Sequence, residues 1–183
     1  MRKKKKLPPP LKSLLYVPAN KEDHLRKAAK LPCDGVILDL QDSVPDTEKD
    51  VARALAAAYA PTFADKQVWV RINEGRGLRS RDIKDLALPC VTGFVIPMVT
   101  SNKTVRRIAR RLRLLALLKG HPARTWFIMP LIETPLGIVN ARSICRASRL
   151  VAAVTFGQHD YLKAVNKRLS ASLLPSTTAQ DLL

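Results

Sequence analysis

Short apolar runs alternate with amphipathic stretches along most of the chain. Six runs predict strands: residues 14–17, 35–40, 68–72, 93–97, 126–132 and 150–156. The run at 35–40 is continuous, as expected for a strand buried on both faces. The stretches between them predict helices over residues 21–30, 46–60, 102–119 and 160–169, and a further helix that opens at Thr134. Strands that alternate with helices at this spacing predict parallel βα units.

Local signals support several of these helices. Asn20 is placed to be the N-cap of the helix over 21–30. Thr134 and Pro135 open the next helix in the preferred way, with threonine as N-cap and proline at the first helical position. Residues 102–119 carry leucines and isoleucine on one face and arginines on the other, which predicts an amphipathic surface helix.

Two α/β architectures satisfy this order: an open doubly wound sheet and a (β/α)₈ barrel. A doubly wound nucleotide-binding sheet normally has a glycine-rich turn after its first strand. Here Pro18, Ala19 and Asn20 occupy that position, and the Gly75–Gly77 pair lacks a third glycine and a helix start. The sequence therefore favours an incomplete TIM (β/α)₈-type barrel of about six βα units. We expect it to span residues 13–170, between a basic proline-rich tail at 1–12 and a short irregular end at 171–183.

The net charge of +17 is concentrated in two places. Residues 2–6 form a basic run, and residues 103–124 contain eight Lys or Arg residues without an acid. A basic surface of this kind binds nucleic acid or an anionic membrane, or it is a solvated helix face and tail. The chain lacks RNA-binding aromatic motifs and zinc-finger spacing, so it does not predict sequence-specific recognition.

The same front segment bears on localisation. Prolines at positions 8–10 follow the basic run, where a signal peptide needs an apolar segment. In addition, no apolar run reaches the length of about 20 residues that a membrane-spanning helix needs. We expect a cytoplasmic protein without a membrane span.

Polar side chains follow the predicted strands where each strand ends. Because the active sites of barrels lie at the carboxyl ends of the strands, we expect these groups to converge. Acids beside one arginine predict a cation site next to a carboxylate-binding group. Oxygen ligands without His or Cys suit Mg²⁺ before Mn²⁺. The residues concerned are Asp39, Asp42, Arg71, Asn73, Glu133 and Asp160.

Five short motifs occur in an order and approximate spacing that resemble a known family. They are Ser-Leu-Leu-Tyr-Val-Pro-Ala-Asn at 13–20, Leu-Asp-Leu-Gln-Asp-Ser-Val at 38–44, Val-Arg-Ile-Asn at 70–73, Met-Pro-Leu-Ile-Glu-Thr-Pro at 129–135 and Phe-Gly-Gln-His-Asp at 156–160. Together they resemble the HpcH/HpaI aldolase and citrate lyase β-subunit family, in particular its citrate lyase β-like and malyl-CoA lyase-like branch. The resemblance runs from Leu11 to about Leu169.

The resemblance implies a magnesium-dependent carbon–carbon lyase that acts on short hydroxy or oxo acids, often as CoA thioesters. It implies that Glu133 and Asp160 ligate Mg²⁺ and that Arg71 holds the substrate's carboxylate or oxo group. Lys12, near an arginine that the family carries, would contact the substrate together with Asn73. The resemblance also implies a supporting role for Asp39 and Asp42, which would orient metal-bound water or a ligand.

Each of these residues also has a simpler structural interpretation. Glu133 and Asp160 are compatible with interactions at helix starts, and Arg71 with a structural ion pair. For Asp39 and Asp42 the alternative is a turn.

Two features depart from the family pattern. Gln41 stands where the family usually has glutamate. Full-length members continue through a seventh and an eighth strand into a lid, so we expect this chain to be C-terminally truncated. We also expect a homo-oligomer or a completing partner chain. A catalytically inactive relative and a basic binding protein that contacts RNA remain alternative functions.

Overall fold

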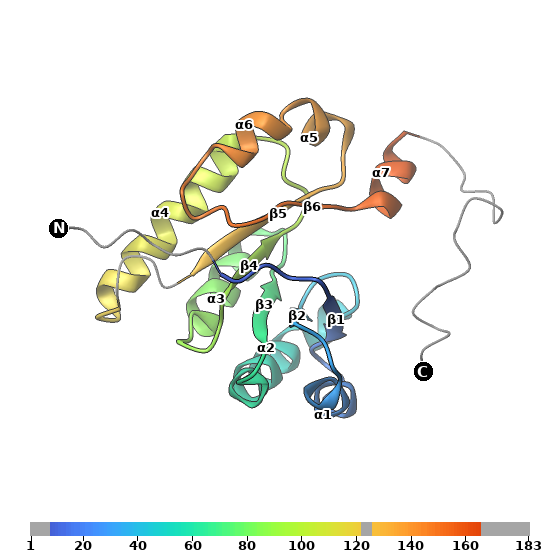
Figure 1. The fold of residues 1–183 in the computed structure, drawn as a ribbon. Helices are drawn as coiled ribbons and strands as arrows, with labels where there is room; N and C mark the ends of the chain where they lie inside the picture. Colours follow the sequence, from blue (N-terminus) through green and yellow to red (C-terminus); the bar gives the residue numbers. More distant parts are fainter. Residues whose placement is uncertain (1–7, 122–125, 166–183) are drawn as a thin grey trace.

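Six parallel strands form one sheet in chain order in the computed structural model, which describes residues 8–121 and 126–165 (Figure 1). Each strand pairs in parallel with the next, without the reversal of strand order that marks a doubly wound sheet. The sheet is curled, and the prediction of an incomplete TIM-type barrel is confirmed. The strands are β1 (Leu14–Pro18), β2 (Gly35–Asp39), β3 (Gln67–Arg71), β4 (Gly93–Ile96), β5 (Phe127–Ile132) and β6 (Thr155–Phe156).

Helices connect the strands and cover the outer side of the curled sheet (Figure 1). Among the described residues, none of these helices has the length and apolar character that crossing a membrane requires. The α-helices are α1 (Glu22–Lys30), α2 (Lys49–Tyr59), α3 (Arg76–Leu86), α4 (Asn102–Leu118), α5 (Pro135–Val139), α6 (Ala141–Cys145) and α7 (Gln158–Ala164), and the short 3₁₀ segments η1 (Asp46–Glu48) and η2 (Ala60–Phe63) flank α2.

The two faces of the sheet have different cores because successive side chains of a strand point to opposite faces. On β2, Val36 and Leu38 join the large core that the sheet shares with the helices, whereas Ile37 belongs to a smaller inner cluster. Trp69 of β3 and Met129 of β5 lie in the same inner cluster. One face therefore packs against helices and the other encloses a barrel-like interior, which fits part of a (β/α) barrel.

The structure corrects two predictions about helix starts, one at Asn20 and one at Gly75–Gly77. Helix α1 begins at Glu22 with Lys21 as its N-cap, and the Asn20 side-chain amide instead donates to Glu48 Oε2 at 2.5 Å. The prediction that no helix starts at Gly75–Gly77 is wrong, because α3 begins at Arg76. The local sequence does not predict this helix, because tertiary contacts stabilise it, above all those of its fully buried Asp82.

The last elements match the predictions in part. Thr134 Oγ1 accepts a hydrogen bond from Gly137 N at 3.0 Å, so the predicted N-cap is confirmed. The predicted sixth strand is shorter than expected, since β6 covers Thr155–Phe156 and a single bridge from Val151 to Ile128 precedes it. The ends of the predicted 160–169 helix and of the proposed barrel segment at 170, together with the tail at 171–183, lie outside the described residues.

Candidate functional site

The inner face of the sheet carries the predicted site residues at its carboxyl end. Ile37, Trp69 and Leu131 belong to the inner cluster. The charged residues Asp39, Arg71 and Glu133 each follow one of these apolar residues by two positions. A spacing of two keeps a side chain on the same face of an extended strand. The apolar inner cluster therefore ends in a layer of charged groups at the mouth of the partial barrel.

Arg71 and Asp39 form a two-point ion pair across adjacent strands. Arg71 Nε donates to Asp39 Oδ1 at 2.7 Å and Nη2 donates to Asp39 Oδ2 at 2.6 Å. Nη1 donates to Asp42 Oδ2 at 3.0 Å, and the guanidinium carbon lies 5.2 Å from the centre of the Tyr16 ring. The structure therefore fixes the orientation of Arg71, in the ion-paired arrangement that the sequence left open as an alternative.

Asp39 also organises the loop that follows β2. Its carboxylate accepts hydrogen bonds from Gln41 N at 2.9 Å, Ser43 N at 3.2 Å and Ser43 Oγ at 2.5 Å. Burial acts to raise the pKa of Asp39, but the hydrogen bonds and charge of Arg71, with those of Ser43 and Gln41, hold the pKa below its ordinary value. Asp39 is therefore an ionised anchor for Arg71 and for the turn toward Asp42.

Glu133 is, like Asp39, a buried acid of the mouth, with a residue exposure of 3%. Its Oε1 accepts a hydrogen bond from the backbone N–H of Met98 at 2.6 Å. Burial raises the pKa of Glu133, the Met98 N–H opposes that shift, and the charge of Asp160 raises the pKa further. The Glu133 carboxylate also packs against Gly157, three residues before Asp160, so the chain places the two acids on the same side of the sheet.

Met98 reaches this position through an unusual backbone conformation. Its φ of 52° lies in the left-handed region, which disfavours a residue with a Cβ by about 1–2 kcal/mol. This conformation follows directly after β4 and Pro97, and it accompanies the short contact from the Met98 N–H to Glu133. The strained backbone of Met98 thus lies where its N–H holds Glu133 Oε1 in place.

Gly157 forms a close-fitting cradle for the same carboxylate. A Cβ placed on Gly157 would lie 2.5 Å from Glu133 Oε2 and 2.6 Å from Glu133 Cβ. Any side chain at position 157 would therefore require Glu133 to move. Because Gly157 has no side chain, Glu133 Oε2 can occupy the space directly beside its backbone.

Asp160 lies in the first turn of α7, where its Oδ1 accepts from Lys163 Nζ at 3.1 Å. Asp160 lines a cavity of about 410 Å³ together with Asp42, Met98 and Glu74. The carboxyl ends of the strands thus open into a polar cavity that has acids on several sides.

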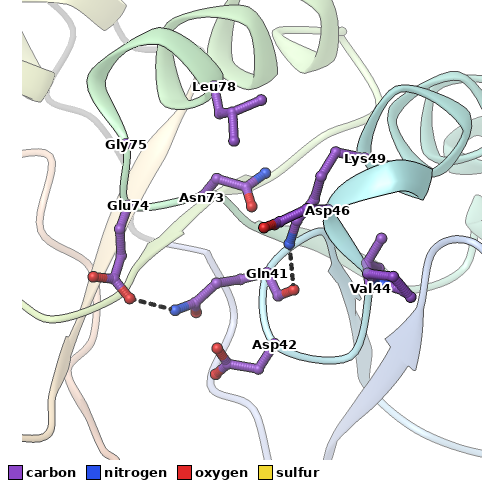
Figure 2. A pocket seen from close by; sticks show the side chains of 10 residues that line it. Gln41, Asp42, Val44, Asp46, Lys49, Asn73, Glu74, Gly75 and Leu78 are labelled. Atoms are coloured by element: carbon purple, nitrogen blue, oxygen red, sulfur yellow. Dashed lines mark hydrogen bonds between the residues drawn. The ribbon is translucent and has the colours of Figure 1, made fainter.

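A neighbouring cavity of about 470 Å³ lies between the loop after β2 and the start of α3 (Figure 2). Gln41 points toward Glu74, and its Nε2 donates to Glu74 Oε1 at 2.7 Å. Lys49 donates to the backbone oxygens of Gln41 at 2.5 Å and Leu40 at 2.9 Å. Gln41 Oε1 is buried without a hydrogen-bond partner among the described residues, so this amide is only partly satisfied.

Of the other two predicted substrate-binding residues, Lys12 lies away from the mouth and Asn73 lines the neighbouring cavity. Lys12 precedes β1, and its backbone N–H donates to Asp34 Oδ2 at 2.7 Å at the opposite, amino end of the sheet. Asn73 is buried and donates from its backbone and its side chain to Asp82 Oδ2, at 2.9 Å each. Arg53 Nε completes this network with a 2.9 Å bond to Asp82 Oδ1. The structure therefore brings Lys12 away from the site and uses Asn73 to anchor α3.

Sequence reasoning missed Met98, Gly157 and Glu74 as parts of the site. Gly157 had a readable signal, because it lies inside the last motif between a strand and Asp160. Met98 had none, since a left-handed methionine results from tertiary contacts rather than from its own preference. Glu74 follows Asn73 at the end of β3 and was readable by the same rule of strand ends.

The donor set can be tested against a magnesium ion. Within the described ranges, three or more His, Cys, Asp or Glu side chains are nowhere grouped to hold a metal. Mg²⁺ characteristically takes one or two protein carboxylates and completes its octahedron with water and substrate oxygens. Glu133, whose Oε2 sits in the Gly157 cradle, and Asp160 fit that requirement.

Comparison with known proteins places this geometry in a family. The sequence profile described as HpcH/HpaI aldolase/citrate lyase matches residues 12–173. A "citrate lyase subunit beta-like protein" of Deinococcus radiodurans is 32% identical over 161 residues, which cover 82% of this chain and 52% of that protein. A "(3S)-malyl-CoA thioesterase" of Cereibacter sphaeroides is 32% identical over 177 residues, which cover 94% of this chain and 58% of that protein.

A solved structure agrees with these sequence matches. The citrate lyase β subunit of M. tuberculosis, complexed with oxaloacetate and magnesium, superimposes with a TM-score of 0.69 at 26% identity. The match covers 92% of this chain and 69% of that one. The chain spans about half the length of the two relatives named above, which are 52% and 58% covered. Sequence profile, relatives and fold agree, and the chain belongs to the HpcH/HpaI aldolase/citrate lyase family.

Proposed function

We propose that the chain functions as a magnesium-dependent carbon–carbon lyase. Its reaction would cleave or form short hydroxy or oxo acids, including their CoA thioesters. The observation that supports the proposal is the placement of two acids after neighbouring strands. Glu133 follows β5 and accepts from the Met98 N–H, and Asp160 follows β6 and lines a cavity together with Met98. The oxaloacetate and magnesium held by the M. tuberculosis relative support the choice of ligand class.

The roles of the residues follow from their contacts. Glu133 and Asp160 would hold Mg²⁺, which supplies a Lewis acid for the carbonyl oxygen whose negative charge grows as the carbon–carbon bond breaks. The Met98 N–H and the Gly157 cradle keep the Glu133 carboxylate in one orientation.

Arg71 would orient the carboxylate or oxo group of the substrate. The guanidinium has five N–H donors, of which three are used on Asp39 and Asp42. Because Asp39 and Asp42 hold the guanidinium, its two remaining N–H donors have a fixed orientation.

Thioester hydrolysis is a second candidate, because the C. sphaeroides relative is named as a thioesterase. The two reactions on malyl-CoA leave different products. Carbon–carbon cleavage gives acetyl-CoA and glyoxylate, whereas hydrolysis gives malate and free CoA. A thiol reagent for free CoA and a hydrazine reagent for glyoxylate, applied to one reaction, separate the two.

Calorimetric titration with Mg²⁺ tests the metal site independently of turnover. Glu133→Gln and Asp160→Asn should each weaken binding at least about tenfold, or about 1.4 kcal/mol, because each removes a charged oxygen ligand. Asp65→Asn removes an exposed carboxylate that pairs with Lys66 far from the mouth, and it should leave affinity unchanged. Unchanged Mg²⁺ affinity in both site variants would remove the metal site and the lyase proposal with it.

Oxaloacetate binding tests Arg71. Arg71→Lys retains the charge but loses the planar two-point geometry, so it should weaken oxaloacetate binding while Mg²⁺ affinity stays nearly the same. Loss of Mg²⁺ binding in a folded Arg71→Lys variant would assign Arg71 to support of the metal site instead.

A further inference from the structure

A groove on the outer surface, between α3 and α4, gathers positive charge. Its wall contains five arginines and, among all its lining residues, no carboxylate. The groove has a volume of about 320 Å³, and buried Ile83 and Ile108 contribute apolar surface to it. We call it the arginine groove and define it by Arg76, Arg79, Arg107, Arg110 and Arg111.

Two of these arginines are held in place by their neighbours. Arg111 donates to Ser80 Oγ at 3.0 Å and to the Ser80 backbone oxygen at 3.1 Å, so it bridges from α4 to α3. Arg79 donates to the backbone oxygens of Asn73 and Glu74. These bonds use neutral acceptors, so they position the guanidinium groups without neutralising their charge.

Arg107 and Arg110 are exposed on α4, and among the described residues neither has a hydrogen-bond or ion-pair partner. Helix α4 itself carries six basic residues and no acid. Burial lowers the pKa of Arg79; the charge of Glu74 opposes that shift, whereas the charges of Arg107 and Arg76 lower the pKa further. Like charges thus crowd around one groove, and an anionic ligand would relieve that repulsion.

We propose that the arginine groove binds the phosphate backbone of single-stranded nucleic acid without sequence preference. Arg110 and Arg111 lie three and four positions after Arg107, so both are about 5–6 Å from Arg107 on the next turn of α4, and all three line the groove. Several separate positive charges, contributed by both helices along one groove, suit a chain of phosphates better than a single anion.

The shape and lining of the groove select among the sources of phosphate. A strand one phosphate wide can enter a groove between two helices, whereas a flat membrane surface cannot. The lining contains no aromatic side chain on which a base could stack, so recognition is confined to the backbone. This inference is independent of the proposed lyase activity, because the arginine groove shares no lining residue with the cavity that Asp160 lines.

Fluorescence anisotropy with a labelled oligouridylate, measured over a series of salt concentrations, tests the proposal on the full chain. Arg107→Gln/Arg110→Gln should weaken binding at least about tenfold. It should also reduce the slope of log affinity against log salt by about 1.4, at about 0.7 per lost phosphate contact. The matched control is Arg142→Gln/Arg146→Gln, which removes two exposed charges, one in α6 and one at its C-cap, both outside the groove. It should change both quantities much less.

Three results would overturn the proposal: equal losses in the two double variants, no loss in the groove variant, or a groove variant that loses binding to phosphatidylserine vesicles and keeps the oligonucleotide. Arg107→Lys/Arg110→Lys preserves the charge and should retain most of the affinity. This second variant keeps the test decisive if the glutamine variant fails to fold, as judged by thermal unfolding.

Discussion

The mouth of the partial barrel and the arginine groove both concentrate charged side chains, but the charges are buried and paired at the mouth and exposed in the groove. At the mouth, Arg71 has 13% and Asp39 2% of its side chain exposed, and the two bind each other at two points. In the groove, Arg107 and Arg110 are exposed and unpaired within the described part of the chain.

The two regions therefore differ in how much their charged side chains contribute to the stability of the fold. A buried ion must be paired, because an uncompensated buried charge is strongly destabilising. An exposed arginine is solvated and contributes little to folding, so a cluster of them acts on other molecules. The comparison therefore predicts large folding effects for changes at the mouth and small ones in the groove.

The largest effect should come from breaking the buried ion pair. Arg71→Leu leaves Asp39 buried without its partner and should lower the free energy of unfolding by about 3 kcal/mol. Arg107→Leu, the matched change in the arginine groove, should leave it nearly unchanged, since no partner is lost. Urea unfolding followed by circular dichroism measures both. Equal destabilisation in the two variants would abolish the distinction between the two regions.

A second, intermediate effect is expected at Gly157. Gly157→Ala would place a methyl group 2.5 Å from Glu133 Oε2, so it should destabilise the protein by about 1–3 kcal/mol through overpacking. It should also weaken Mg²⁺ binding, because Glu133 has to move. Gly77→Ala in α3 meets no atom within 4 Å and should raise stability slightly, as alanine favours a helix. Thermal unfolding measures the stability of the two variants, and calorimetry measures their Mg²⁺ affinity. If Gly157→Ala changed neither quantity, the close contact between Gly157 and Glu133 would be wrong.

Much of the fold was readable from the sequence because two periodicities dominate it. The first five predicted strands lie within a residue or two of the observed ones, and their order excludes a doubly wound sheet. Asp39, Arg71 and Glu133 were readable as site candidates for the same reason, since a strand end on the inner face faces the mouth.

The remaining features depend on contacts between distant segments. Helix α3 has few local signals and rests on Asp82, whose partners Asn73 and Arg53 come from other parts of the chain. Lys12 was a candidate substrate ligand because the family carries an arginine near it, although it lies at the amino end of the sheet. The left-handed Met98 follows from the fit of β4 to Glu133, which no local pattern reports.

The smallest effect concerns pH, and it separates two acids within the mouth itself. The pKa of Asp39 is below its ordinary value of 3.8, because Arg71 outweighs the effect of burial. The unfolded chain therefore takes up that proton at a higher pH than the folded protein does. Stability should rise with pH near and below 3.8 and be lost as the pH falls through the folded pKa.

Glu133 should give the opposite slope. Burial raises its pKa above the ordinary value of 4.5, so the folded protein binds the proton more tightly than the unfolded chain. In metal-free buffer, stability should therefore fall as the pH rises from about 4.5 through the folded pKa. Glu133→Gln should remove the falling slope and Asp39→Asn the rising one, whereas Arg107→Gln in the arginine groove should alter neither. Urea unfolding across the pH series measures these slopes. A falling slope that survives in Glu133→Gln would show that another group is responsible, and the assignment of a destabilising buried charge to Glu133 would be wrong.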